Sequence, residues 1–222
     1  MIDPWENTNR KVFAFNEALD IHALQPVARE WDRLIPDAVQ KMLTNFRSNL
    51  HYPVVLINDL FQANLKAAAL ETGRFLVNTT LGFGGLFDPA TTWALPRYDQ
   101  DFGLTLGHWG VDMGPYLVIP LIGASTARDL SGGLVDAGLG VVSMGPLAIA
   151  WYITAPLQTV QTINSRAAYL KIVEENRRAA FDYYSFVRDA YLQHRENQAR
   201  EGGAQVGSGN DIYYPDTEKD SP

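Results

Sequence analysis

Cysteine is absent from the 222-residue chain, which excludes disulfides, a thiolate nucleophile and any cysteine-ligated metal site. Positive charge is also scarce, because 18 Lys and Arg residues stand against 25 Asp and Glu residues and leave a formal net charge of −7. Such a balance disfavours non-specific binding to nucleic acid, and we expect no nucleic-acid partner. The chain is nevertheless long enough, and at 46% hydrophobic residues apolar enough, to bury a core.

Sequence motifs for catalysis and cofactor binding are missing as well. The four histidines are scattered, and the cluster GFGGLF departs from the dinucleotide-binding pattern. Neither a phosphate-binding loop nor a nucleophile elbow occurs. Asp101, His108 and Ser125 are the residue types of a catalytic triad, but a helix cap, a packed histidine and a turn serine explain them better. We therefore expect no catalytic residue, no cofactor and no metal.

The distribution of glycine and proline predicts a mainly helical chain. Glycine is absent from residues 3–72, so the first third is predicted to be helical. The segment PDAVQKMLTNFRSNL predicts one helix, and a second amphipathic helix is predicted over residues 54–77, with its stop at the glycine cluster. The longest helix is expected from about Pro156 to about Arg195. The prolines that flank PYLVIP restrict it to a short extended or hairpin segment.

These elements predict one all-α domain over residues 3–195, with a short Gly/Pro-rich hairpin-like segment. From Glu196 onward the sequence is polar and glycine-rich with few aliphatic residues, which is typical of a disordered tail over residues 196–222.

Three uncharged tracts cover residues 75–87, 113–127 and 137–165. The third contains GLGVVSMGPLAIAWYITAPL, which has roughly the 20 residues that a membrane-spanning helix needs. Pro146 and Pro156 are predicted to break it into two shorter helical pieces. The tracts are therefore either a large buried core or, with their flanking tryptophans, surface that faces lipid.

Several motifs, in one fixed order, carry a family resemblance. DPWENTNRKVFAFNEALD, TNFRSNL, RFLVNTTLGFGGLFDPA and DFGLTLGHWGVDMGPYLVIPLIGASTARD, followed by VDAG, resemble the MlaA (VacJ) family of outer-membrane lipoproteins. The resemblance implies a ring-shaped helical domain embedded in the inner leaflet of the outer membrane, around an amphipathic channel. It also implies association with a trimeric porin and non-enzymatic transfer of mislocalised phospholipid to a periplasmic carrier protein, which maintains lipid asymmetry.

Family precursors carry a signal peptide and a lipidated cysteine, and neither is in the printed sequence. We therefore expect that Met1 is an expression start, that the anchor has been removed, and that the protein belongs on the periplasmic side of the outer membrane. Two alternatives remain. One is a soluble periplasmic lipid carrier, and the other is a porin-binding adaptor without a lipid channel.

Under this resemblance, GPYLVIPLIG is the candidate element for lining or gating the lipid path, because its apolar side chains lie between glycines and prolines. A rigid packed hairpin is the alternative. In TNFRSNL we expect substitutions to disturb function, although spacing alone predicts a core position for its phenylalanine. The lipid-path candidates are Asn45, Phe46, Gly114, Tyr116, Leu117, Val118, Ile119, Leu121 and Gly123. The membrane-facing candidates are Leu147, Ile149, Trp151, Tyr152 and Ile153.

Overall fold

The computed structural model describes residues 3–144 and 151–200, which form helices, short loops and one two-stranded sheet. The predicted all-α fold class is confirmed. Within these residues, none of the helices combines the length and apolar character needed to cross a membrane. The elements are α1 (Glu6–Leu19), η1 (Asp20–Leu24), α2 (Gln25–Leu34), α3 (Asp37–Phe61), α4 (Leu65–Thr80), α5 (Pro89–Thr92), α6 (Phe102–His108), β1 (Tyr116–Ile119), β2 (Gly123–Thr126), α7 (Ala127–Met144), α9 (Trp151–Ala168), α10 (Leu170–Ala179) and α11 (Tyr183–Arg200).

The first helices form one continuous run in which the π-helical segment η1 joins α1 to α2. The run ends where Ile35 adopts an extended conformation, with φ −100° and ψ 119°, directly before Pro36. Steric contact with the proline ring disfavours helix at the preceding residue, which explains this end. Helix α3 starts after Pro36, as the segment PDAVQ predicts.

Helix α3 passes through Pro53 without ending. The predicted start of a second helix at residue 54 is therefore wrong, because the chain breaks later, between α3 and α4. At that break Ala63 has a positive φ of 55°. The Asn64 side chain accepts a hydrogen bond from the Ala67 amide at 3.1 Å and so caps the start of α4.

The single long helix predicted over residues 156–195 is also wrong, because this region forms α9, α10 and α11. Pro156 lies inside α9 and does not end it. The chain turns at Ala180, which is extended with φ −74° and ψ 129°. Asp182 then accepts hydrogen bonds from the amide and hydroxyl of Ser185, and this cap starts α11.

Two predictions reach residues outside the described part of the chain. Helix α11 continues to Arg200, so the first residues of the predicted tail are helical, and residues 201–222 are not described. The predicted break at Pro146 falls within residues 145–150, which are not described either.

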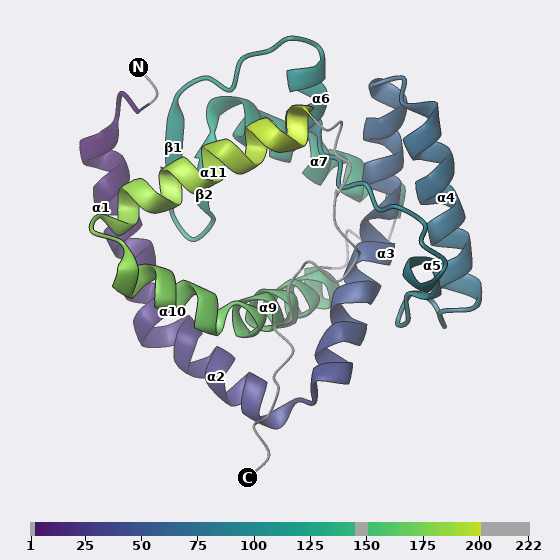
Figure 1. Cartoon of the computed structure of the whole chain (residues 1–222), viewed down its shortest axis with the longest axis horizontal. Coiled ribbons are helices and arrows are strands. Elements are labelled where there is room, and N and C mark those ends of the chain that lie inside the picture. Colours follow the sequence, from purple (N-terminus) through teal and green to yellow (C-terminus); the bar gives the residue numbers. More distant parts are fainter. Residues whose placement is uncertain (1–2, 145–150, 201–222) are drawn as a thin grey trace.

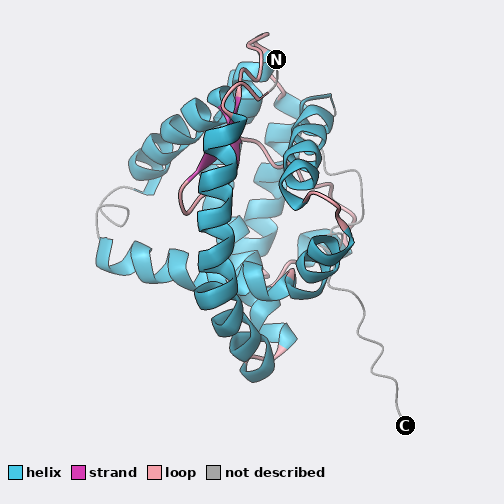
Figure 2. Ribbon diagram, turned by 90° about the vertical axis from the view of Figure 1, so that its left-hand side faces the viewer, coloured by secondary structure: helices cyan, strands magenta, loops and turns pink. Residues whose placement is uncertain are grey.

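The helices follow one another around the outline of the molecule, with α4 and α5 to one side (Figure 1). Helix α2 packs on α9, α3 contacts α4, α7 and α9, and α6 contacts both α7 and α11. The run from α1 to α2 extends along the molecule in front of the two strands (Figure 2). Because α1 contacts β1 and α11 contacts β2, the sheet is held between the first and last helices.

Ion pairs join helices that are distant in the sequence. Arg166 in α9 pairs with Asp20 in η1 at 2.7 Å, and Arg195 in α11 pairs with Asp101 at 2.6 Å and with Asp129 in α7 at 2.8 Å. Burial would by itself raise the pKa of Asp129, but hydrogen bonds from Arg195 hold that pKa below its usual value. Asp129 therefore stays ionised, and the two pairs of Arg195 fix α11 against α7 and the start of α6.

The interior is unusually polar. Among the described residues, buried polar or charged side chains outnumber buried apolar ones. The apolar core cluster consists of Tyr116, Val118 and Tyr184, with partly buried apolar residues of α1 and α11 packed around it. Large apolar side chains are exposed instead, among them Phe83 at 75%. Buried polar groups in this number, together with exposed large apolar side chains, are the informative departures from the usual pattern of a water-soluble protein.

Candidate functional site

The predicted hairpin segment is present. Strands β1 and β2 pair antiparallel, with Tyr116 opposite Thr126 and Ile119 opposite Gly123. Gly114, before β1, and Gly123, at the start of β2, have φ values of 69° and 103°, which side chains rarely adopt. The turn between the strands points toward the middle of the circuit of helices in Figure 1. Gly114 and Gly123 thus lie at positions where the backbone conformation favours glycine.

Two asparagines of α1 hold the free edge of β1. Asn9 donates to the Tyr116 carbonyl and accepts from the Val118 amide, each at 3.0 Å. Two turns later Asn16 donates to the Ile119 carbonyl at 3.0 Å and accepts from the Leu121 amide at 2.9 Å. These side chains take the place of a third strand along the free edge of β1, where the Ile119 carbonyl also accepts from the Ile122 amide at 3.2 Å.

The side chains of the hairpin differ in exposure. Tyr116 and Val118 are buried in the apolar core cluster, and Leu117 and Ile119 are partly buried. Burial raises the pKa of the Tyr116 phenol to about 12. At the turn, Leu121 is 78% exposed and its neighbour Ile122 is 75% exposed. Of the lipid-path candidates in the hairpin, Leu121 at the turn is therefore accessible from outside, whereas Tyr116 and Val118 are not accessible in this conformation.

The TNFRSNL segment lies in the middle of α3, and its asparagines donate hydrogen bonds to the glycine-rich loop GFGGLF over residues 82–87. Asn45 donates to the Leu86 carbonyl at 3.2 Å, and Asn49 donates to the Thr79 hydroxyl at 3.0 Å. A side chain at Gly85, whose φ is 91°, would come within 2.4 Å of Asn49 Cβ. Phe46, the other candidate of this segment, is partly buried on the same helix.

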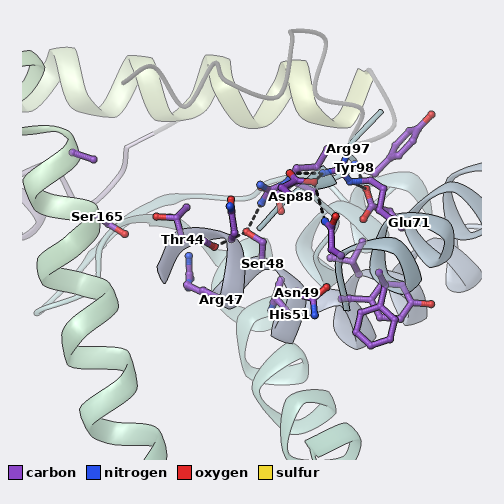
Figure 3. A pocket seen from close by; sticks show the side chains of 18 of the residues that line it. Thr44, Arg47, Ser48, Asn49, His51, Glu71, Asp88, Arg97, Tyr98 and Ser165 are labelled. Atoms are coloured by element: carbon purple, nitrogen blue, oxygen red, sulfur yellow. Dashed lines mark hydrogen bonds and ion pairs between the residues drawn. The ribbon is translucent and has the colours of Figure 1, made fainter. Parts of the chain in front are cut away.

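A polar pocket of about 330 Å³ lies next to Asn45. It is formed by α3, α4, the loop over residues 97–99 and the end of α9. Figure 3 shows Ser165 of α9 on one side, Thr44, Arg47 and Ser48 of α3 in the middle, and Arg97 on the other side. The Arg97 guanidinium donates to the Ser48 hydroxyl at 3.0 Å. We call this the polar pocket.

The wall of the polar pocket that α4 provides is neutralised internally. Arg74 is buried and donates to both oxygens of Asp88, at 2.8 and 3.1 Å. Burial would raise the pKa of Asp88, but the Thr91 hydroxyl and Arg74 lower it below its usual value. Burial raises the pKa of Glu71, which accepts a hydrogen bond from the Tyr98 amide at 2.6 Å. These groups therefore serve mainly to hold α4, α5 and the loop together.

A second pocket of about 500 Å³ lies on the other side of Asn45. Asn45 and Asp88 line both pockets, so the two share a wall. The side chains of the second pocket are mostly apolar, and we call it the apolar pocket. It is lined by Ala38, Lys41, Met42, Asn45, Leu81, Leu86, Phe87, Asp88, Pro89, Thr91 and Thr92.

Of the three residue types of a triad, the structure confirms only the predicted helix cap. His108, the last residue of α6, is exposed, and Ser125 lies in strand β2, so the expected packed histidine and turn serine are wrong. Asp101 accepts from the Leu104 amide at 2.8 Å, which caps α6, and it pairs with Arg195. Ser125 is buried and donates to the Thr126 carbonyl. Within residues 3–144 and 151–200, His, Asp and Glu side chains form no group suited to a metal ion.

The family model described as MlaA lipoprotein matches residues 1–198. The chain belongs to the MlaA lipoprotein family.

Named relatives of this MlaA family chain include the intermembrane phospholipid transport system lipoproteins MlaA of Escherichia coli strain K12 and of Haemophilus influenzae. Each is 35% identical to the chain over 90% of its length, which covers 79% and 80% of the relative. An uncharacterized protein of Rickettsia felis is 37% identical over 88% of the chain and 80% of its own length. A solved structure concerning the structural basis for maintenance of bacterial outer membrane lipid asymmetry has a TM-score of 0.78 and 35% identity, and the match covers 89% of this chain and 98% of that one.

The membrane-facing candidates of this MlaA family chain cannot be placed. Leu147 and Ile149 lie outside the described residues. Trp151, Tyr152 and Ile153 form the first turn of α9, and their side chains are outside the described part. Sequence reasoning missed Asn9 and Asn16, whose spacing of two helical turns in DPWENTNRKVFAFNEALD is the signal for one polar face of α1.

Proposed function

We propose that this chain removes mislocalised phospholipid from the outer leaflet of the outer membrane and passes it to a periplasmic carrier, which maintains lipid asymmetry. The relatives that carry a functional name are lipoproteins of an intermembrane phospholipid transport system, and the solved structure concerns outer-membrane lipid asymmetry. These relatives are components of a transport system, so the proposal includes no catalytic step and no cofactor.

The observation that carries the proposal is the polar interior together with the exposed apolar side chains. Among the described residues, many large apolar side chains are exposed, while a set of polar and charged side chains larger than the apolar core is buried. A protein that lies in lipid gains from apolar surface outside and from pairing of its internal polar groups, as in the ion pairs of Arg166 and Arg195. We infer that the helices form a ring embedded in the inner leaflet of the outer membrane, with its anchor on the periplasmic side and a trimeric porin beside it.

Within this ring, polar groups would provide a path for the lipid headgroup. An unsolvated ion in an apolar medium costs several kcal/mol or more, and a polar lining lowers that cost. The acyl chains can stay against apolar side chains, so the path is amphipathic and requires no energy source in this chain. Direction then comes from the affinity of the periplasmic carrier.

The hairpin is the proposed border of this path. Its base is fixed, because Asn9 is buried and pairs the backbone of β1. Movement is least costly at the turn, where Leu121 is exposed and the backbone is held by Asn16 and by one hydrogen bond from the Ile122 amide to the Ile119 carbonyl, at 3.2 Å. The proposed gating element is therefore the turn with Leu121 and Ile122. The other two lipid-path candidates, Asn45 and Phe46, lie in α3 and not in the hairpin.

The test is rescue of outer-membrane lipid asymmetry in an Escherichia coli strain that lacks its own MlaA relative. The chain is expressed behind the export signal of that relative, and surface-exposed phospholipid is measured. We expect exposure to fall to the wild-type level, and unchanged exposure with normal amounts of folded protein contradicts the proposal.

Purification distinguishes the two other classes. The proposed ring requires detergent and co-purifies with phospholipid and a porin. A soluble carrier stays monodisperse without detergent, and an adaptor retains the porin without phospholipid.

A further inference from the structure

Arg47 and Arg97 differ from the other arginines of the chain in lacking an ion pair among the described residues. Every other arginine lies in the described residues and forms an ion pair with a carboxylate within 4.0 Å. Arg47 and Arg97 form no such pair there. Both line the polar pocket, on either side of Ser48 in Figure 3. The chain has a net negative charge, so two unpaired guanidinium groups in one pocket point to an anion.

Neither arginine has a carboxylate within 4.0 Å among the described residues, and the charge of Arg97 acts on Glu71 only at longer range, where it opposes the rise in the pKa of that carboxyl that burial causes. Arg97 is partly buried and donates to a neutral hydroxyl, that of Ser48. Arg47 is exposed at the mouth of the pocket. Of the acidic residues in the wall, Asp88 is already paired with Arg74, and only Glu71 and Asp99 add further negative charge. A guanidinium group offers a fork of N–H donors that matches two oxygens of a phosphate.

The neighbouring apolar pocket limits the kind of anion. Asn45 and Asp88 line both pockets, so the pockets adjoin at the Asn45 side chain, which donates to the Leu86 carbonyl at 3.2 Å. Leu81, Leu86 and Phe87 contribute apolar surface to the second pocket. A ligand that fits both must carry an anionic group joined to a hydrocarbon chain.

We propose that Arg47 and Arg97 bind the phosphodiester of a phospholipid whose acyl chain enters the apolar pocket, with Asn45 at the junction of headgroup and chain. This subsite rests on the proposed function, because it assumes that phospholipid is what the chain handles. Inorganic phosphate shares the anionic chemistry but lacks the hydrocarbon part, so it distinguishes the two sources of phosphate.

The test is binding of dihexanoyl phosphatidylcholine, a short-chain monomeric phospholipid, to the purified protein by calorimetry. We expect Arg47→Gln and Arg97→Gln each to weaken binding about tenfold, as expected for loss of a charge-assisted hydrogen bond. Leu81→Gln in the apolar pocket should weaken it as well. Arg33→Gln is the matched control, because Arg33 is exposed on α2 outside both pockets and should leave binding unchanged.

Arg47→Gln keeps this test decisive, since Arg47 forms no hydrogen bond or ion pair within the described residues and its loss should leave the fold intact. Wild-type affinity in both arginine variants overturns the subsite. Binding of inorganic phosphate as tight as that of the lipid also overturns it, because the pocket is then a site for free anions. Rescue of lipid asymmetry by the wild-type chain is scored separately, so a failed subsite leaves the proposed function standing.

Discussion

Asn9 shows how much of this fold depends on single polar side chains. It is 3% exposed, and it pairs the Tyr116 carbonyl and the Val118 amide inside the protein. We predict that Asn9→Ala lowers the free energy of unfolding by about 2–5 kcal/mol, because two buried backbone groups lose their partners. Asn16→Ala, which removes two hydrogen bonds from α1 to the more exposed turn, should cost about 1 kcal/mol or less. Urea unfolding followed by circular dichroism measures both, and equal losses contradict the distinction.

Asp59 in α3 is the residue for which pH dependence is expected. It is 0% exposed, and neither carboxylate oxygen has a hydrogen-bond partner among the described residues. Burial, with the negative charge of Glu71, raises its pKa from 3.8 to about 7. Between these values the folded state holds a proton that the unfolded state has released, so Asp59 lowers stability as pH rises from about 4 to about 7.

We predict that Asp59→Asn raises the free energy of unfolding at pH 8 by a few kcal/mol, at about 1.4 kcal/mol per pKa unit, and that this gain disappears near pH 4. Burial also lowers the pKa of His51, which makes the protein more stable as pH rises over part of the same pH range. The quantity compared is therefore the free energy of unfolding of the variant minus that of the wild type at each pH, from which the contribution of His51 cancels. Asp112→Asn, at an exposed position, is the control. A gain that is independent of pH contradicts the assignment to ionisation of Asp59.

At the scale of elements, the sequence located the helical regions but not the joints between them. The sequence predicts a break at Pro156, yet α9 passes through it, as α3 passes through Pro53, because the cost of one lost hydrogen bond is offset by packing along the rest of the helix. The joints lie instead at the caps of Asn64 and Asp182. Asn9 was missed for a different reason, since its partner Tyr116 is 107 residues away.

The contact between α6 and α7 is set by glycines. A Cβ at Gly132 of α7 would lie 2.3 Å from the Gly103 amide nitrogen of α6, while a Cβ at Gly133 meets nothing within 4 Å. We predict that Gly132→Ala lowers the free energy of unfolding by about 2 kcal/mol or more, because the backbones must separate. Gly133→Ala should raise it by about 0.5–1 kcal/mol through helix propensity alone. Thermal unfolding of both variants measures this difference. Equal shifts in the unfolding midpoints of Gly132→Ala and Gly133→Ala would rule out a close contact between α6 and α7.

At the scale of the whole molecule, motifs in a fixed order are enough to indicate the family. The polar interior and the exposed large apolar side chains can be recognised only from the structure. Composition alone gives an ordinary acidic chain with 46% hydrophobic residues. Only the structure separates exposed apolar residues such as Leu121 from buried polar ones such as Asn9 and Asp59. The arginines Arg47 and Arg97 likewise become distinct only when the ion pairs of all the others are known.

Gating by the hairpin turn links this architecture to transport and can be tested because the chain has no native cysteine. The turn is bonded to α1 through the contact between Asn16 and the Leu121 amide. We predict that Asn16→Cys/Leu121→Cys, joined by a short bis-maleimide, no longer restores lipid asymmetry in cells, since the turn cannot leave α1. The double variant without the linker is the control for the lost contact between Asn16 and the Leu121 amide. Leu121→Cys modified with a monofunctional maleimide is the control for the added bulk. Undiminished transport by the linked protein means that lipid passes a hairpin that does not move, and the rigid packed hairpin is then the correct description.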